Sequence, residues 1–228
     1  MGSVAPESLR LSEHGAQLYD SALTSSELTS LTDVVKQLPP DQAGIRIHGV
    51  AGIQRFIEPG TAAASIASAE LGPKCRPVRA ILFDKTPQTN WALGWHQDRT
   101  IVVQERIEVE GYGPWTMKNG LIHVEPPFEL LATMITVRIH LDPTPPGNAP
   151  LLIAPGSHRY GRIPIADIPE VARRCGTVAC LAEAGDVWAY STPILHASEA
   201  AVGPVHRRVL QVDYSAESLP NNLEWLGV

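Results

Sequence analysis

Two short segments far apart in the chain carry side chains that could together bind a metal ion. His96 and Asp98 are separated by one residue in the segment 95–98 (WHQD), and residues two apart on an extended chain point to the same side. An imidazole and a carboxylate on one face form two thirds of the facial triad that holds iron(II) and leaves the opposite positions open. A His-x-Asp pair alone arises often by chance, so its interpretation depends on a third ligand.

His196 is the natural third ligand, 100 residues beyond His96 and shortly after the apolar segment 187–190. Arg207 follows eleven residues after His196, at the start of another strand-like segment. Arginine presents a planar fork of donors that binds a carboxylate through two hydrogen bonds. A site that chelates iron through a 2-oxo acid needs such a group for the far carboxylate, and the hydroxyl of Ser198 could bind the same carboxylate. The pattern favours an oxygenase site of this kind.

The elements that must position these residues are mostly strands. Residues 24–27 (TSSE) have the form of a capping box, and apolar residues at helical spacing follow until Pro39-Pro40. A second helix is expected over residues 59–71, which Gly72-Pro73 ends. Strands are expected at residues 78–83, 100–109, 134–141, 151–154, 187–190 and 207–214. The clearest, 134–141 (MITVRIHL), alternates apolar and polar side chains and so predicts one face of each kind.

This density of short strands, with helices gathered at the front, predicts a β-sandwich flanked by N-terminal α-helices. The length of 228 residues fits one domain, 1–228, and no internal repeat or linker divides it. The 20 prolines and 18 glycines suit a chain with many turns.

Composition excludes several classes of function. The net charge is −6 and no basic run occurs, which argues against nucleic-acid binding. Residues 1–12 lack the apolar core of a signal peptide and no stretch approaches membrane-spanning length, so we expect a cytoplasmic protein with no membrane partner. The three cysteines have no CxxC spacing and are expected to be reduced thiols. The sequence carries no indication of oligomeric state.

Several segments, in the same order, resemble the phytanoyl-CoA dioxygenase family, which includes ectoine hydroxylase. They are residues 82–87 (LFDKTP), 95–98 (WHQD), 147–151 (GNAPL), 155–158 (PGSH) and 185–187 (GDV), followed by His196, Ser198 and Arg207. The resemblance covers roughly residues 15 to 215 and is specific because of the ordered set rather than any single motif.

The resemblance implies a mainly β fold, the double-stranded β-helix (jelly roll, cupin-like). It implies iron(II) bound by His96, Asp98 and His196, with 2-oxoglutarate held by Arg207 and Ser198 and dioxygen as the oxidant. The implied reaction is hydroxylation, or another oxidation, of a small molecule with release of succinate and CO2. Related halogenases lack the carboxylate ligand, so the presence of Asp98 favours hydroxylation.

Four further residues enter the expected site or its surroundings. Lys85 matches a recurrent lysine of the family, and Arg138 stands where several relatives carry an aromatic residue near the co-substrate. Arg138 is expected to contact 2-oxoglutarate or an anionic substrate, or to pair with a carboxylate. Trp115 is expected to line a substrate pocket, since a long segment after His-x-Asp can form a lid. Arg208 should face away from Arg207, because neighbours on a strand alternate.

Two other functions are compatible with the metal ligands alone. One is a non-catalytic jelly-roll module that binds a metal for structural reasons, and the other is a zinc hydrolase that uses the same three ligands. Both leave Arg207 without a role, and zinc more usually draws on additional His or Cys ligands.

Overall fold

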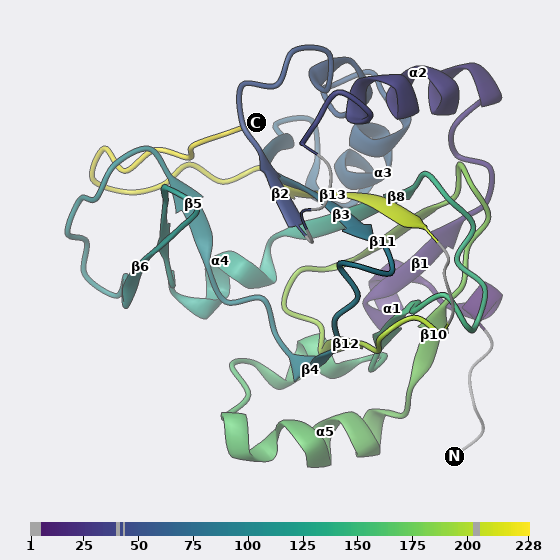
Figure 1. Cartoon of the computed structure of the whole chain (residues 1–228). Coiled ribbons are helices and arrows are strands. Elements are labelled where there is room, and N and C mark those ends of the chain that lie inside the picture. The colour runs from purple at the N-terminus through teal and green to yellow at the C-terminus, as the bar shows by residue number, and fades with distance from the viewer. Residues whose placement is uncertain (1–5, 40–41, 43, 203–205) are drawn as a thin grey trace.

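The computed structural model describes residues 6–39, 42, 44–202 and 206–228. It is mainly β, with a six-stranded, a four-stranded and a three-stranded antiparallel sheet (Figure 1). The six-stranded major sheet has the order β1 (Ala16–Tyr19), β11 (Val187–Ser191), β8 (Ile135–His140), β13 (Arg207–Ser215), β3 (Arg76–Lys85) and β2 (Gly44–Ile47). The minor sheet has the order β10 (Val178–Cys180), β9 (Leu151–Ile153), β12 (His196–Ser198) and β4 (Leu93–His96).

The third sheet is set apart from these two. It consists of β5 (Ile101–Val103), β7 (Leu121–Val124) and β6 (Trp115–Lys118), in that order. The helices are α1 (Leu11–His14), α2 (Ser25–Val35), α3 (Ala62–Leu71), α4 (Phe128–Ala132) and α5 (Ile168–Cys175), with short 3-10 turns at Pro6–Ser8, Gln54–Phe56, Ser157–Tyr160 and Ile165–Asp167. No helix in the described ranges is both long and apolar enough to cross a membrane.

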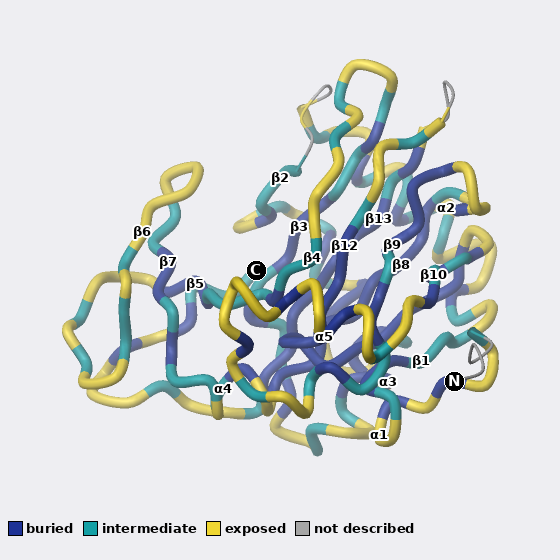
Figure 2. Tube along the Cα trace, turned by 90° about the horizontal axis from the view of Figure 1, so that it is seen from below, coloured by how far each residue is buried: buried dark blue, intermediate teal, exposed yellow. Residues whose placement is uncertain are grey.

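The two faces of the major sheet differ in chemistry, as the alternation in residues 134–141 predicts. Ile135, Val137 and Ile139 of β8 lie in the largest apolar cluster, together with residues of α2 and α3 such as Leu31 and Ala67. Figure 1 shows these helices above the major sheet and the minor sheet below it. The opposite, inner face therefore carries the polar side chains, which are buried all the same (Figure 2).

Both predicted N-terminal helices are present. In the capping box of α2, the backbone N–H of Glu27 donates to Thr24 Oγ1 at 3.2 Å, and that of Thr24 donates to Glu27 Oε2 at 2.8 Å. This pair satisfies two donors that a helix N-terminus leaves free. Helix α3 begins later than expected, after the cap at Thr61, and ends at Gly72. Pro40 lies outside the described residues.

The strand expected over residues 100–109 is wrong in its second half. Only Ile101–Val103 forms a strand, because its partner β7 begins at Leu121, directly after the turn at Asn119 and Gly120. Residues 104–109 have no strand to pair with, so their apolar alternation only packs Ile107 and Val109 against the surface of a small cluster. Sequence reasoning also missed α5 and the short strands β2, β4, β6, β7, β10 and β12.

Candidate active site

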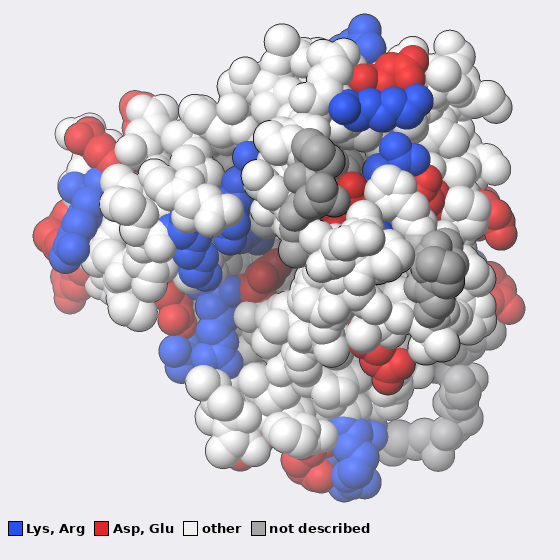
Figure 3. All heavy atoms as spheres, viewed as in Figure 1, with Lys and Arg blue, Asp and Glu red and all other residues white. Residues whose placement is uncertain are grey.

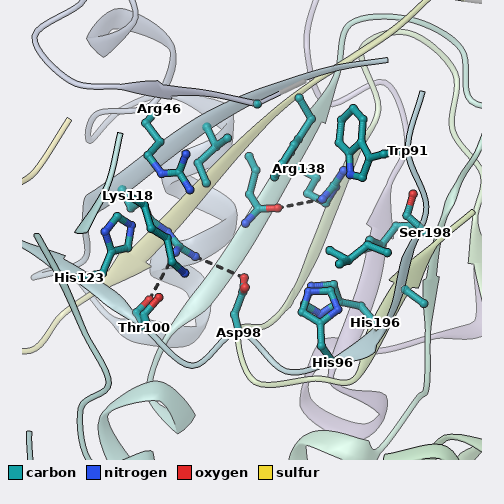
Figure 4. A pocket seen from close by; sticks show the side chains of 18 of the residues that line it. Arg46, Trp91, His96, Asp98, Thr100, Lys118, His123, Arg138, His196 and Ser198 are labelled. Carbon is teal, nitrogen blue, oxygen red and sulfur yellow. Dashed lines mark hydrogen bonds and ion pairs between the residues drawn. The ribbon is translucent and has the colours of Figure 1, made fainter. Parts of the chain in front are cut away.

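A cavity of about 360 Å³ lies between the inner face of the major sheet and the minor sheet (Figure 4). Strands β2, β3, β8 and β13 supply one wall, and β4, β9 and β12 supply the other. Residues of β6 and β7 line one end of it. The cavity collects side chains from positions 44 to 211, so it exists only in the folded chain.

His96, Asp98 and His196 meet on one side of this cavity, with ligand atoms that all lie within 4.8 Å of one another. His96 and His196 are direct partners on the neighbouring strands β4 and β12, which brings their ring centroids to 4.2 Å. Asp98 lies two residues beyond the end of β4. The strand pairing therefore joins the two segments that are distant in sequence.

Both imidazoles are oriented by the backbone. Nδ1 of His96 lies 2.8 Å from the Gly94 carbonyl oxygen, and Nδ1 of His196 lies 3.0 Å from that of Ile194. When each Nδ1–H donates to its carbonyl, each Nε2 lone pair is free for a metal. Burial, reinforced by His96, lowers the pKa of His196 to about 4, so its ring is neutral at neutral pH, as a metal ligand must be.

The Asp98 carboxylate is held by a buried arginine. Arg79 Nη2 lies 3.3 Å from Asp98 Oδ2, and Arg79 Nε donates to Asp213. Burial alone would raise the pKa of Asp98, but Arg79, followed by His196, lowers it below its usual value. The carboxylate is ionised, and together with two free Nε2 atoms it makes a donor set that fits iron(II).

Three cations lie beside the triad on the major sheet. Lys85 and Arg207 are partners on β3 and β13, and Arg138 lies on β8. All three are at most 5% exposed, yet none forms an ion pair in the described part of the chain. Buried charges are normally paired. We refer to Lys85, Arg138 and Arg207 as the first cation group.

Within this group, Lys85 contacts the hydroxyl of Ser198, which is expected to bind the co-substrate. Lys85 Nζ donates to Ser198 Oγ at 2.8 Å and to two backbone carbonyl oxygens, of Trp91 at 2.7 Å and of Glu199 at 2.6 Å. Burial, followed by the charges of Arg207 and Arg138, lowers the pKa of Lys85 to about 8. The ammonium is therefore still mainly protonated at neutral pH, but close to losing its charge.

The two adjacent arginines lie as strand alternation predicts. Arg207 lines the cavity, where its Nη1 donates to the Ala149 carbonyl and its Nε is buried without a partner. Burial, together with Arg138, lowers the pKa of Arg207 to about 9, so the guanidinium is charged at neutral pH. Arg208 points away and binds Asp142 through two contacts of 2.7 and 2.9 Å.

Arg138 reaches the cavity and pairs with no carboxylate of the described residues. Its Nη1 donates to Gln211 Oε1 at 2.8 Å, its guanidinium lies 5.3 Å from the centroid of the Phe83 ring, and its Nε is buried without a partner. Of the three expectations for this residue, contact with an anion in the cavity is the one that its surroundings favour.

Trp115 is not among the residues that line the cavity. Its ring packs in the cluster around Val124, and Arg106 lies 5.5 Å from its centroid. The hairpin does reach the site, but through Lys118 and His123. Trp115 and Lys118 are three apart on β6 and so face opposite ways, which puts the tryptophan on the wrong side of the hairpin.

Sequence reasoning missed Arg46, Arg79, Lys118, His123 and Gln211, all of which line the cavity. A signal existed for Arg79, a charged residue within the apolar segment 78–83. No comparable signal marks Lys118 or His123, because only the hairpin's packing beside β2 and β3 brings them to the cavity.

The comparisons with known proteins agree with this geometry. The model of the phytanoyl-CoA dioxygenase family matches residues 13–209. No curated protein sequence matches the chain.

Solved structures share the fold over nearly the whole chain. The chain is similar to AviO1 from Streptomyces viridochromogenes Tue57, at 18% identity and a TM-score of 0.66, over 93% of this chain and 94% of that one. It is similar to EctD from S. alaskensis with 2-oxoglutarate and 5-hydroxyectoine, at 20% identity and a TM-score of 0.67, over 100% of this chain and 82% of that one. A third is the non-haem, alpha-ketoglutarate-dependent epimerase SnoN from nogalamycin biosynthesis. It is 14% identical with a TM-score of 0.65, over 96% of this chain and 92% of that one. The fold is thus the expected jelly roll.

Proposed function

The chain belongs to the phytanoyl-CoA dioxygenase family, and from this premise we propose which residues carry out its chemistry. The protein is a non-haem iron(II) oxygenase that depends on 2-oxoglutarate and dioxygen. Within this class we propose a hydroxylase of a small organic molecule, and we treat residues 1–228 as one domain. The major sheet supports that last point, since it combines β1 from one end of the chain with β13 from the other.

His96, Asp98 and His196 are proposed to hold the iron. Iron(II) bound there would chelate the 2-oxo acid and bind dioxygen, and decarboxylation of 2-oxoglutarate to succinate and CO2 would accompany oxidation of the substrate. The carbonyl oxygens of Gly94 and Ile194 keep the two Nε2 atoms free for the metal, and Arg79 keeps Asp98 ionised and oriented.

The first cation group is proposed to bind the far carboxylate of 2-oxoglutarate. Arg207 would supply the bidentate contact, since its Nε has no partner and its side chain lines the cavity beside the triad. Lys85 and the Ser198 hydroxyl that it contacts would support the same carboxylate. Three buried cations without a carboxylate partner need an anion of this kind, whereas a structural metal site or a zinc hydrolase would leave them without a role.

Two features support hydroxylation of a small molecule. Asp98 supplies the carboxylate ligand that related halogenases lack, which favours hydroxylation over halogenation. The volume of about 360 Å³ lies at the lower end of cavities that bind small molecules. EctD was crystallised with the small molecules 2-oxoglutarate and 5-hydroxyectoine, and SnoN is an epimerase from nogalamycin biosynthesis; both are consistent with a pocket for a small molecule.

The observation that carries the proposal is the triad next to three buried cations that form no ion pair with any residue the structure describes. Iron(II) and 2-oxoglutarate added without oxygen should produce a weak visible charge-transfer band, and the band should be absent with succinate in place of 2-oxoglutarate. Asp98→Ala serves as the site variant and Asp142→Ala as a control whose carboxylate binds only Arg208. A band that forms equally in Asp98→Ala would contradict the ligand set.

A further inference from the structure

A second group of basic side chains lines the cavity away from the first. Arg46 on β2, Lys118 on β6 and His123 on β7 come together there (Figure 4). Burial lowers the pKa of His123, and its Nδ1 lies 3.0 Å from the Leu121 carbonyl oxygen, so the neutral ring presents Nε2 as an acceptor rather than as a cation. We refer to Arg46 and Lys118 as the second cation group.

Arg46 is the member that most needs a ligand. It is half-buried, its Nε is enclosed without a partner, and its side chain forms no hydrogen bond or ion pair within the described ranges. The carboxylates of Asp98 and Asp213 bind Arg79 rather than Arg46, and burial, followed by the charge of Arg79, lowers the pKa of Arg46. A guanidinium in this position fits a small oxyanion through its planar donors.

One molecule of 2-oxoglutarate does not serve both groups. Arg138, Gln211, Ile81 and Arg46 are successive partners across β8, β13, β3 and β2. Three strand spacings separate the backbones of Arg138 and Arg46, or roughly 14 Å. Asp98 lies between Lys118 and Arg138 in Figure 4, with the imidazoles of His96 and His196 beside it.

The charge of the lining is opposite to that of the chain as a whole. The cavity is lined by Arg46, Arg79, Lys118, Arg138 and Arg207 against one carboxylate, Asp98, although the net charge of the protein is −6. Figure 3 shows Lys and Arg gathered along the hollow between the third sheet and the rest of the molecule. Such a field concentrates anions at the site.

We propose that the substrate is a small organic oxyanion whose carboxylate or phosphate group binds Arg46, with Lys118 in support. This inference rests on the proposed function, because it takes the cavity to be the active site of an oxygenase that oxidises a substrate. An anionic group held at Arg46 leaves the rest of the molecule to extend toward the triad. The second cation group thus selects the substrate class, and the first binds the co-substrate.

The first test measures binding with two simple probes, sulfate and acetate. Each is titrated calorimetrically, at constant ionic strength, into the chain loaded with iron(II) and saturating 2-oxoglutarate under anaerobic conditions. Arg46→Gln should weaken the binding of at least one probe about ten- to a hundredfold. Lys118→Gln, at an exposed position, should weaken it by about two- to fivefold. Arg55→Gln removes an equal charge from an exposed residue outside the lining and should change it by less than roughly twofold.

Three results would overturn the inference. They are an absence of probe binding to the wild-type chain, an equal loss in Arg55→Gln, and an Arg46→Gln variant that loses 2-oxoglutarate affinity instead of probe affinity. The charge-transfer band tests the proposed function separately. If no band forms, the titration is repeated on the metal-free chain, and the difference between wild type and Arg46→Gln still decides.

A second test distinguishes the two kinds of oxyanion and uses turnover. Pairs of small carboxylic acids and their primary amides, and pairs of phosphate monoesters and their parent alcohols, are scored by stimulated succinate release. The proposal expects stimulation only by the charged member of a pair, and Arg46→Gln should remove that preference. Stimulation by the neutral members as strongly as by the charged ones would contradict it.

Discussion

The two walls of the cavity are built for different tasks. The minor-sheet wall carries the imidazoles of His96 and His196, each oriented by a backbone carbonyl at its Nδ1. The major-sheet wall carries charged side chains, of which Arg79 is paired and Arg46, Arg138 and Arg207 are not. A wall that binds a metal needs lone pairs held in fixed positions. A wall that binds anions needs positive charges that no carboxylate of the protein neutralises.

This difference predicts different responses to mutation. Removing a metal ligand should abolish the chemistry, because iron positions both oxidant and co-substrate. Removing a cation from the other wall should give a graded loss of affinity, because neighbouring cations remain. The predictions below follow that ranking from the largest expected effect to the smallest.

The largest effect is expected from His96→Ala, Asp98→Ala and His196→Ala. Each should reduce iron-dependent succinate release below detection, since an incomplete triad holds the metal poorly. The fold should persist, because the ligands lie on the cavity surface rather than in the apolar clusters. Turnover and thermal unfolding check this together, and near-normal turnover with little added iron in any variant would refute the triad.

Arg207→Ala should raise the apparent constant for 2-oxoglutarate about thirty- to a thousandfold, because a buried bidentate contact contributes roughly 2–4 kcal/mol. Iron affinity, measured by metal titration, should be nearly unchanged. Arg138→Ala is the comparison within the same group. If Arg138→Ala has the larger effect on this constant, Arg138 rather than Arg207 holds the far carboxylate.

Arg79→Gln should weaken iron binding about ten- to a hundredfold, the usual cost of losing a partner that orients a metal ligand. Arg79 touches Asp98 but lines the opposite wall, so it tests whether the two walls act on each other. Arg79→Lys, which keeps the charge, should recover part of the affinity in a metal titration. Unchanged iron affinity in a folded Arg79→Gln variant would show that the walls are independent.

Lys85 should make 2-oxoglutarate binding sensitive to pH. Its pKa is lowered to about 8, so the ammonium of the free enzyme loses its charge as pH rises through that value. Affinity for 2-oxoglutarate should therefore fall above pH 8, by about tenfold for one charge-assisted hydrogen bond. Lys85→Arg stays charged and should flatten the profile; a fall of the same size in that variant would rule out Lys85 as its source.

The smallest effect is expected from Arg208→Ala. Its guanidinium is on the far side of β13 with Asp142, so the 2-oxoglutarate constant should change by less than about tenfold. Steady-state kinetics of Arg207→Ala and Arg208→Ala, measured side by side, give a matched comparison at neighbouring positions. A larger effect of Arg208→Ala than of Arg207→Ala would mean that Arg208, and not Arg207, faces the co-substrate.

Local patterns in the sequence predicted much of this molecule. The capping box at Thr24 and Glu27 defines a helix start through bonds between residues three apart, and alternation in β8 and β13 defines which side chains share a face. These interactions involve near neighbours, so the order of residues is enough to predict them. The ordered motifs also indicate the family without any knowledge of the fold.

Other features were decided by packing between distant segments. The alternation of residues 100–109 predicted a strand, but β7 offers partners for only three residues. Trp115 had a suitable residue type, yet the orientation of the β6–β7 hairpin points it away and brings Lys118 and His123 to the cavity.

By itself the sequence determined the ligand types, the helix caps and the alternation of the main strands, because each depends on residues close together in the chain. Only the tertiary structure decided that His96 opposes His196, and that Lys85, Arg138 and Arg207 share one buried surface. It also decided that Arg46 is left without a partner among the described residues. Those relations depend on strand pairing between residues at least 35 apart in the chain, where no local spacing carries the information.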